Sequence, residues 1–333
     1  MPNNFFFSDF LSSITERGRS LLRQRAWPDD PAGQAAHMIE ACETVLSGRG
    51  EASGAALSRD VLDHYAQMEP SAKLAFFKAL AHQFGTQRER LETAIDAWRA
   101  NPSDDTAADL HFATEPRRQE LFRRLNRAPG ATAAIVQMRA EMLAMAKAHP
   151  DLAAVDRDFA HLLASWFNRG FLVLKHIDWS TPASILEKII RYEAVHEIRG
   201  WADLRRRIDP ADRRCYAFFH PALADEPLIF VEVALTEEMP GAIAPLLAAD
   251  RKILPAKKAR CAVFYSISNC QAGLAGISFG NFLIKQVVTE LQRELPRLET
   301  FVTLSPVPGF RGWLRQTGHL PAAEEDRALL EGL

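Results

Sequence analysis

The stretch ARCAVFYSISNCQAGLAGISFGNFLIKQVVTELQRELPRLETFVTLSPVPGFRGWL, residues 259–314, decides the fold of the C-terminal half of this chain. Cys261 to Ile267 is a short apolar run rich in β-forming residues, which predicts a strand that is buried on both faces. The polar segment Ser268 to Gly276 contains two glycines and predicts a turn. Phe301 to Leu304 predicts a second short strand, followed by the rigid loop Ser305 to Gly309.

Between the two strands the sequence changes to a helical period. An amphipathic helix of about four turns is predicted, because its apolar residues recur three or four positions apart and stop at Pro296. These residues are Phe279, Phe282, Leu283, Val287, Leu291 and Leu295. The unit is therefore strand, glycine loop, helix, strand, and the loop lies where a helix N-terminus could bind an anion. It matches neither the P-loop nor the Gly-x-Gly-x-x-Gly pattern, and two glycines alone are more typical of a turn.

Several motifs of this stretch together resemble the malonyl-CoA decarboxylase family. They are YSIS at Tyr265–Ser268, QAGLAG at Gln271–Gly276, GNFLIKQVV at Gly280–Val288, LQRELPRL at Leu291–Leu298 and LSPVPGF at Leu304–Phe310. The rest of the chain shares the resemblance more loosely, through its helical front end and FFHPALADEPLIFVEVALT at Phe218–Thr236. The resemblance implies an all-helical N-terminal domain, followed by a mixed α/β catalytic domain of the acyl-CoA N-acyltransferase (GNAT) fold.

The N-terminal part of the sequence fits that expectation. Helices are predicted over 8–25, 32–46, 55–68, 71–84, 87–100, 115–127, 131–149 and 152–168, with 101–105 as a polar break and no strand signal. We therefore expect an α+β, multidomain chain: a helical domain over 1–178, acting as scaffold or homo-oligomer interface, and a GNAT-like domain over 179–333. Within the second domain, helices are predicted at Thr181–Glu193 and Trp201–Ile208, and strands at Cys215–Phe219 and Leu228–Leu235.

Composition excludes several classes of function. The chain has 333 residues, 47% of them hydrophobic, and a formal net charge of −2, which gives no electrostatic case for nucleic acid. Its four cysteines and ten histidines show no metal-ligand spacing, so no metal is expected. There is no apolar run long enough to span a membrane and no basic leader segment, so we expect a cytoplasmic protein. A basic face on the helix over 115–127 is typical of a solvated or acid-paired surface, and less often of a phosphate grip.

The resemblance implies the reaction and the site. Decarboxylation of malonyl-CoA to acetyl-CoA needs hydrogen bonds to the thioester oxygen and a proton for carbon, and no cofactor beyond the CoA of the substrate. The serine of the LSPxPGF motif corresponds to Ser305, as proton donor or oxyanion donor, and Ser266 corresponds to a substrate-contacting serine. The CoA pyrophosphate is expected at the loop Gln271, Ala272, Gly273, Leu274, Ala275 and Gly276.

Two departures from the family pattern affect these expectations. Ser278 stands where an acidic residue is expected in animal relatives, so no carboxylate role is transferred to it. The catalytic histidine of the family is expected well downstream of LSPxPGF, and the surroundings of His319 do not match its motif. We therefore expect a catalytic domain that lacks its C-terminal part, weak CoA binding, and little or no turnover. The alternatives are a GNAT-fold acyl-CoA N-acyltransferase and a non-enzymatic helical assembly module with a remnant CoA domain.

Overall fold

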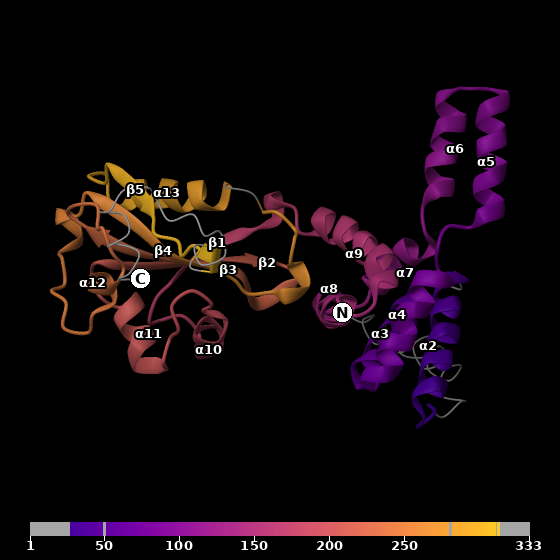
Figure 1. Cartoon of the computed structure of the whole chain (residues 1–333), viewed down its shortest axis with the longest axis horizontal. Coiled ribbons are helices and arrows are strands. Elements are labelled where there is room, and N and C mark those ends of the chain that lie inside the picture. The colour runs from indigo at the N-terminus through magenta and orange to yellow at the C-terminus, as the bar shows by residue number, and fades with distance from the viewer. Residues whose placement is uncertain (1–26, 49–50, 280–281, 311, 314–333) are drawn as a thin grey trace, which may run out of the picture. The chain divides into compact units, whose positions relative to one another are not determined.

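A computed structural model describes residues 27–48, 51–279, 282–310 and 312–313 of the chain, and it shows an α+β architecture (Figure 1). The chain divides into two compact units. The first comprises Met1–Val173, Phe218–Leu228 and Gln271–Leu283, and the second comprises Leu174–Ala217, Ile229–Cys270 and Ile284–Leu333. The predicted helix over 8–25 and His319 lie outside the described residues.

The first unit is built from helices. They are α2 (Pro31–Leu46), α3 (Glu51–Gln67), α4 (Pro70–His82), α5 (Arg88–Ala100), α6 (Asp104–Thr114), α7 (Arg117–Leu125), α8 (Ala131–Ala146) and α9 (Ala153–Trp166), with short 3-10 turns at Pro150–Leu152 and Arg169–Phe171. Their core is aromatic: Phe76, Phe77, Phe122 and Phe159 are at most 1% exposed. The stacked rings of Phe122 and Phe159, 4.1 Å between centroids, join α7 to α9.

Helix α6 was missed by the sequence analysis, which treated residues 101–105 as a polar break. The break is in fact a helix start, because Ser103 and Thr106 form a reciprocal capping box. The Thr106 amide donates to Ser103 Oγ at 3.2 Å, and the Ser103 amide donates to Thr106 Oγ1 at 3.0 Å. Helices α5 and α6 form a hairpin that extends away from α2, α3 and α4 of the same unit (Figure 1).

The second unit contains most of a five-stranded sheet with the order β1-β2-β3-β4-β5. The strands are β1 (Val173–Ile177), β2 (Arg213–His220), β3 (Leu223–Thr236), β4 (Cys261–Asn269) and β5 (Thr300–Thr303). Strand β1 corrects the expectation that no strand precedes residue 178. It is a mostly exposed strand of only five residues, and it carries no run of buried apolar side chains that a sequence pattern could reveal.

Helices cover both faces of this sheet: α13 (Phe282–Glu294) lies on one side, and α10 (Ala183–Tyr192) and α11 (Trp201–Ile208) lie on the other (Figure 1). A short α12 (Ala244–Leu247) and 3-10 turns at Ala256–Lys258 and Ala272–Leu274 complete the elements. Strand β4 runs antiparallel to β3 and parallel to β5, so the predicted order of strand, loop, helix and strand is confirmed. No helix among the described residues has the length and apolar character that a bilayer crossing requires.

Strand β4 contains a β-bulge. The consecutive residues Glu232 and Val233 of β3 face Ser266 and Phe264 of β4, so Tyr265 is the extra residue on the bulged strand. A bulge shifts the alternation of side chains by one position. The strand is buried on both faces over most of its length, as the sequence predicted. Tyr265 packs with Cys261 and Val263 in an apolar cluster beneath the sheet.

Candidate functional site

Strand β4 continues beyond the end of its neighbour β5. The parallel pairing joins Cys261–Phe264 to Thr300–Thr303, whereas β4 extends to Asn269. The last contact is the Leu304 amide, which donates to the Phe264 carbonyl at 2.9 Å. Among the described residues, β5 therefore leaves Tyr265–Asn269 unpaired on its side, and we call this segment the free half of β4.

The two predicted serines both lie where β4 and β5 part. Ser305 follows Leu304 directly and is exposed to solvent. Ser266 is two residues beyond Phe264 and is only 1% exposed. The fold thus brings both serines to the same end of the β4–β5 pair. An exposed hydroxyl can donate to a ligand without any rearrangement, whereas the buried Ser266 has protein partners.

The main partner of Ser266 is Glu193, a residue that the sequence analysis did not identify. Ser266 Oγ lies 2.8 and 2.7 Å from the two carboxylate oxygens of Glu193. Ser268 Oγ donates to the same carboxylate at 3.3 Å, and the amides of Val195 and His196 donate to Glu193 Oε1 at 2.8 and 2.7 Å. Two backbone amides and two hydroxyls thus donate hydrogen bonds to this half-buried carboxylate. We call this cluster the Glu193 clamp.

The clamp forms because two elements meet on one face of the sheet. Ser266 and Ser268 are two positions apart on β4, so their side chains lie on the same face. Helix α10 ends at Tyr192, and Glu193 has an extended backbone that turns the chain toward that face. The Ala194 amide adds a link by donating to Ser268 Oγ at 3.3 Å. A glutamate that follows a helix end is usually an exposed charge, so no local pattern indicated this role.

A second carboxylate, Glu232, lies on β3 in register with Ser266 and is 0% exposed. Its Oε2 accepts a hydrogen bond from Arg207 Nη1 of α11 at 3.2 Å. Among the described residues, no group forms a hydrogen bond with its Oε1, with Arg207 Nε or with Tyr265 Oη, which are buried too. Burial raises the pKa of the Glu232 carboxyl to about 8 in spite of Arg207. A strongly shifted carboxyl beside a candidate serine is typical of a functional region, and also of a structural ion pair.

The predicted CoA loop, Gln271–Gly276, belongs to the first unit, where it packs against α8. Gly273 is buried, and a Cβ at this position would collide with the Val136 carbonyl of that helix. Arg139 of α8, 3% exposed, donates from Nη1 to the Gly273 carbonyl at 2.8 Å and from Nε to Asp156 at 2.9 Å. The glycine is therefore required by the close approach of two backbones.

The loop also uses several of its own amides. Leu274 donates to the Gln271 carbonyl at 2.9 Å, and Ala275 donates to the Ala272 carbonyl at 3.1 Å. Gly276 has a positive φ of 76°, which glycine adopts without strain. A phosphate at this loop would have to bind amides other than those of Leu274 and Ala275, or side chains. Gly280, close to the predicted start of the following helix, lies outside the described residues. The CoA role of the loop stays a prediction.

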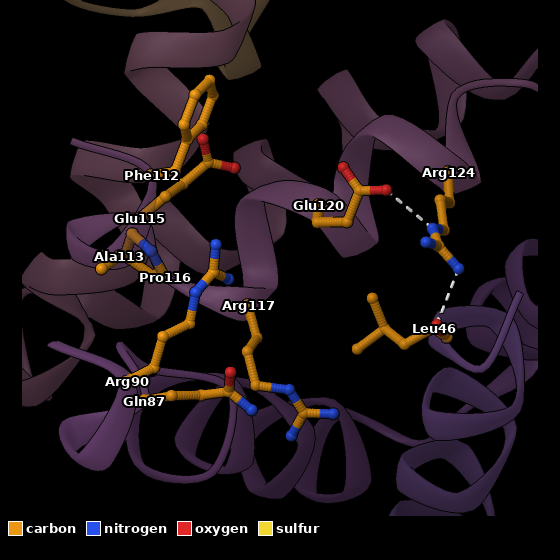
Figure 2. A pocket seen from close by; sticks show the side chains of 10 residues that line it. All are labelled: Leu46, Gln87, Arg90, Phe112, Ala113, Glu115, Pro116, Arg117, Glu120 and Arg124. Carbon is orange, nitrogen blue, oxygen red and sulfur yellow. Dashed lines mark hydrogen bonds and ion pairs between the residues drawn. The ribbon is translucent and has the colours of Figure 1, made fainter. Parts of the chain in front are cut away.

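The helical unit contains a cleft of about 360 Å³ (Figure 2). Its walls carry three arginines and two glutamates: the lining residues are Leu46, Gln87, Arg90, Phe112, Ala113, Glu115, Pro116, Arg117, Glu120 and Arg124. Figure 2 shows Arg124 between the Glu120 carboxylate and the Leu46 carbonyl, each 2.7 Å away.

The basic face predicted on the helix over 115–127 is paired with acids. Arg117 bonds Glu43, Arg118 bonds the nearly buried Asp158, and Arg123 bonds Glu115. The expectation of a solvated or acid-paired surface is confirmed for these residues, because their charges are already compensated. Among the described residues, no cluster of three or more His, Cys, Asp or Glu side chains could hold a metal ion.

A helical unit and a mixed sheet, with two serines where strands β4 and β5 part, define an α+β protein of more than one domain. Comparison with known proteins identifies its family. The family model of the malonyl-CoA decarboxylase C-terminal domain matches residues 170–333, and that of the N-terminal domain matches residues 84–167. The chain belongs to the malonyl-CoA decarboxylase family.

Solved structures and curated relatives agree with this assignment. The malonyl-CoA decarboxylase of Rhodopseudomonas palustris is 60% identical, with a TM-score of 0.83 over 89% of this chain and 73% of that one. That of Agrobacterium vitis is 55% identical, with a TM-score of 0.83 over 88% and 72% of the two chains. The mitochondrial malonyl-CoA decarboxylase of Anser anser anser is 36% identical over 77% of this chain and 54% of its own length.

The mitochondrial malonyl-CoA decarboxylase of Rattus norvegicus is 39% identical over 62% of this chain and 43% of its own length. The chain thus spans about half the length of the curated relatives that it matches. The expectation that the catalytic domain lacks a C-terminal part stays a prediction, and so does the domain boundary at residue 178.

Proposed function

We propose that this chain is a malonyl-CoA decarboxylase, which converts malonyl-CoA and a proton to acetyl-CoA and CO2. The observation that carries the proposal is family membership together with the position of Ser305, an exposed hydroxyl at the point where β4 and β5 part. In the reaction the bond between the carboxylate carbon and the α-carbon breaks, and its electron pair moves into the thioester carbonyl. CO2 leaves, and the α-carbon then takes up a proton.

Ser305 has the chemistry for the charged step. Its hydroxyl can donate a hydrogen bond to the thioester oxygen as negative charge develops there. The same group could pass a proton to the α-carbon afterwards, provided that another acid restores it. The thioester carbonyl accepts the electron pair, so the proposal needs no metal or organic cofactor beyond the CoA of the substrate.

The second unit has features that support a GNAT-like domain. Strand β4 has a bulge at Tyr265, runs antiparallel to β3, and is linked through α13 to the parallel strand β5. The pantetheine arm of a CoA thioester contains two amides in an extended chain, and extended chains bind free strand edges by backbone hydrogen bonds. The free half of β4 offers such an edge, and for this reason we assign it to the CoA arm.

The remaining expectations belong to the same proposal. The loop Gln271–Gly276 is assigned to the CoA pyrophosphate, and Gln271→Ala tests this by weakening the binding of CoA more than that of malonyl-pantetheine. A homo-oligomer formed through the helical unit is tested by light scattering of the 333-residue chain, where a monomer at all concentrations would contradict it. A cytoplasmic location is tested by fractionation of the native host cells.

The decisive experiment measures CO2 release and acetyl-CoA formation from carboxyl-labelled malonyl-CoA by the purified chain, together with the affinity for malonyl-CoA. We expect equimolar products from the wild-type chain and a loss of turnover of about a hundredfold in Ser305→Ala. Binding of malonyl-CoA without any turnover would overturn the decarboxylase assignment. Absence of both would overturn the CoA-thioester assignment as well.

One alternative is favoured by a specific observation. The bulged β4 followed by a parallel β5 is also suited to acyl transfer from CoA to an amine, because the sheet would bind any CoA thioester in the same way. Adding a panel of amines to acetyl-CoA and the chain separates the two functions. Free CoA that appears only when an amine is present would favour the N-acyltransferase.

A further inference from the structure

Among the residues that the structure describes, backbone pairing supports the free half of β4 from one side only. Its β3 edge is paired, with Ile229–Glu232 facing Ser266–Asn269, whereas β5 ends at Thr303. A strand with one free edge keeps its position for a ligand only if other contacts fix it. The Glu193 clamp supplies such contacts on the face of the sheet, through both serine hydroxyls.

The clamp is more than a single hydrogen bond. The Glu193 carboxylate joins the backbone of Val195 and His196 to the side chains of Ser266 and Ser268, and the Ala194 amide bonds Ser268. Hydrogen bonds to a charged acceptor are shorter and stronger than neutral ones. One carboxylate thus fixes two alternate residues of the free half of β4 to the segment that follows α10.

We propose that Glu193 is a positioning residue for the CoA-thioester site, which holds the free half of β4 in the geometry that pairs with the amides of the ligand. The inference rests on the proposed function. It also assigns the two serines to different tasks. Ser266 is 1% exposed and donates a hydrogen bond to Glu193, so it joins β4 to the segment that follows α10. The exposed Ser305 interacts with the reacting thioester.

The physical reason is preorganisation. A backbone hydrogen bond is strong only over a narrow range of distance and angle, so a strand that moves by a fraction of an ångström pairs poorly. Without the clamp, the ligand would have to order the strand on binding, and the affinity would fall by that cost. The clamp therefore acts on ligand binding, and Ser305 acts on the chemical step.

The test is a double-mutant cycle on the affinity for acetyl-CoA, measured by titration calorimetry with the 333-residue chain. The variants are Glu193→Ala, Ser266→Ala and the double variant. We expect each single variant to raise Kd by about tenfold, which corresponds to about 1.4 kcal/mol. Because both substitutions remove the same link, the double variant is expected to bind no more weakly than Glu193→Ala.

Two further variants make the cycle specific. Glu193→Gln keeps an oxygen that can accept from the Val195 and His196 amides and the Ser266 hydroxyl, so most of the affinity should return. Glu197→Ala is the matched control, since the Glu197 side chain is 80% exposed and lies in the same segment. Should Glu193→Ala fail to fold, Ser266→Ala combined with Ser268→Ala removes the links to β4 and leaves the carboxylate with its backbone partners.

Turnover separates positioning from general loss of structure. With malonyl-CoA as substrate, Glu193→Ala should raise KM and leave kcat within about threefold, whereas Ser305→Ala should lower kcat with little change in KM. Unchanged acetyl-CoA affinity in Glu193→Ala, or additive effects in the cycle, would overturn the inference. A wild-type chain that binds acetyl-CoA without decarboxylating malonyl-CoA would overturn the proposed function alone. A chain that binds neither thioester would overturn both.

Discussion

Two carboxylates lie on the same face of the sheet, on either side of Ser266, and their environments differ. Glu193 is half-buried and accepts hydrogen bonds from two amides and two hydroxyls. Glu232 is fully buried and bonds Arg207 at 3.2 Å, while its second oxygen accepts no hydrogen bond from any residue that the structure describes. Hydrogen-bond donors, more than proximity to a cation, therefore decide whether a buried carboxylate has its hydrogen-bonding capacity satisfied.

The difference assigns different tasks to the two groups. A carboxylate with many donors is a rigid anchor, so Glu193 is suited to hold a strand. A carboxylate that is desolvated and short of donors tends to keep its proton, so Glu232 is suited to respond to pH. Substitutions at Glu193 and Glu232 test whether the two carboxylates differ in this way.

The largest effect is expected from Glu232→Ala. The substitution removes the buried carboxylate beside Arg207, whose side chain is 7% exposed, and leaves Asp203 at 3.5 Å as its remaining acidic partner. Loss of one partner of a buried pair typically costs about 3–5 kcal/mol of unfolding free energy, and Asp203 places the expected cost at the lower end of that range. Urea denaturation followed by circular dichroism provides the measurement. Glu232→Gln is the control, because its amide oxygen can still accept from Arg207. Equal stability of the two variants would show that the ion pair contributes nothing.

Glu193→Ala is expected to cost less, about 2–3 kcal/mol, although it removes more hydrogen bonds. The groups that it leaves are two hydroxyls and two amides, which are neutral and partly reachable by water. The same denaturation experiment measures this loss, and Glu193→Gln should recover more than half of it. A cost above that of Glu232→Ala would reverse the ranking of the two carboxylates.

The pH dependence of stability should come from Glu232. Burial raises its pKa in the folded state from the ordinary 4.5 to about 8, so the folded chain binds a proton that the unfolded chain has released. Stability therefore falls as pH rises through this window, by at most about 1.4 kcal/mol per pH unit from this group. The difference in unfolding free energy between wild type and Glu232→Gln isolates the effect. A difference that stays constant from pH 5 to 8 would contradict it.

The smallest effect is expected at Ser268. Its hydroxyl lies 3.3 Å from the Glu193 carboxylate, compared with 2.7 Å for Ser266, so Ser268→Ala should cost about 0.5–1 kcal/mol and Ser266→Ala about twice as much. Thermal unfolding of the two single variants gives the comparison. If Ser268→Ala were the more damaging change, the clamp would depend on the Ala194 amide instead of the carboxylate.

Most of the fold could be predicted from the sequence, because periodicity, proline and glycine are local signals. The range of α11 was predicted without error, and the strand–loop–helix–strand order around Gln271 was confirmed. Helix α6 was missed because Ser103 was counted in a polar break over 101–105, although it forms a capping box with Thr106. Strand β1 was missed because a short, exposed strand has no apolar pattern.

The site was predicted only in part, for a physical reason. Motifs indicated Ser266 and Ser305, and the fold brings both to the end of the β4–β5 pairing. Glu193 and Glu232 come from a helix end and a neighbouring strand, so their relation to Ser266 depends on tertiary packing and on the bulge at Tyr265. Gly273 has a packing role against α8 that loop composition alone cannot distinguish from phosphate binding.

Amide hydrogen exchange with and without saturating acetyl-CoA tests the central claim, that a CoA thioester binds along the free half of β4. We expect slower exchange for backbone amides within Ser266–Asn269 when the ligand is present, and a smaller slowing in Glu193→Ala at equal saturation. Unchanged exchange throughout β4, with protection confined to other elements, would contradict binding along this strand.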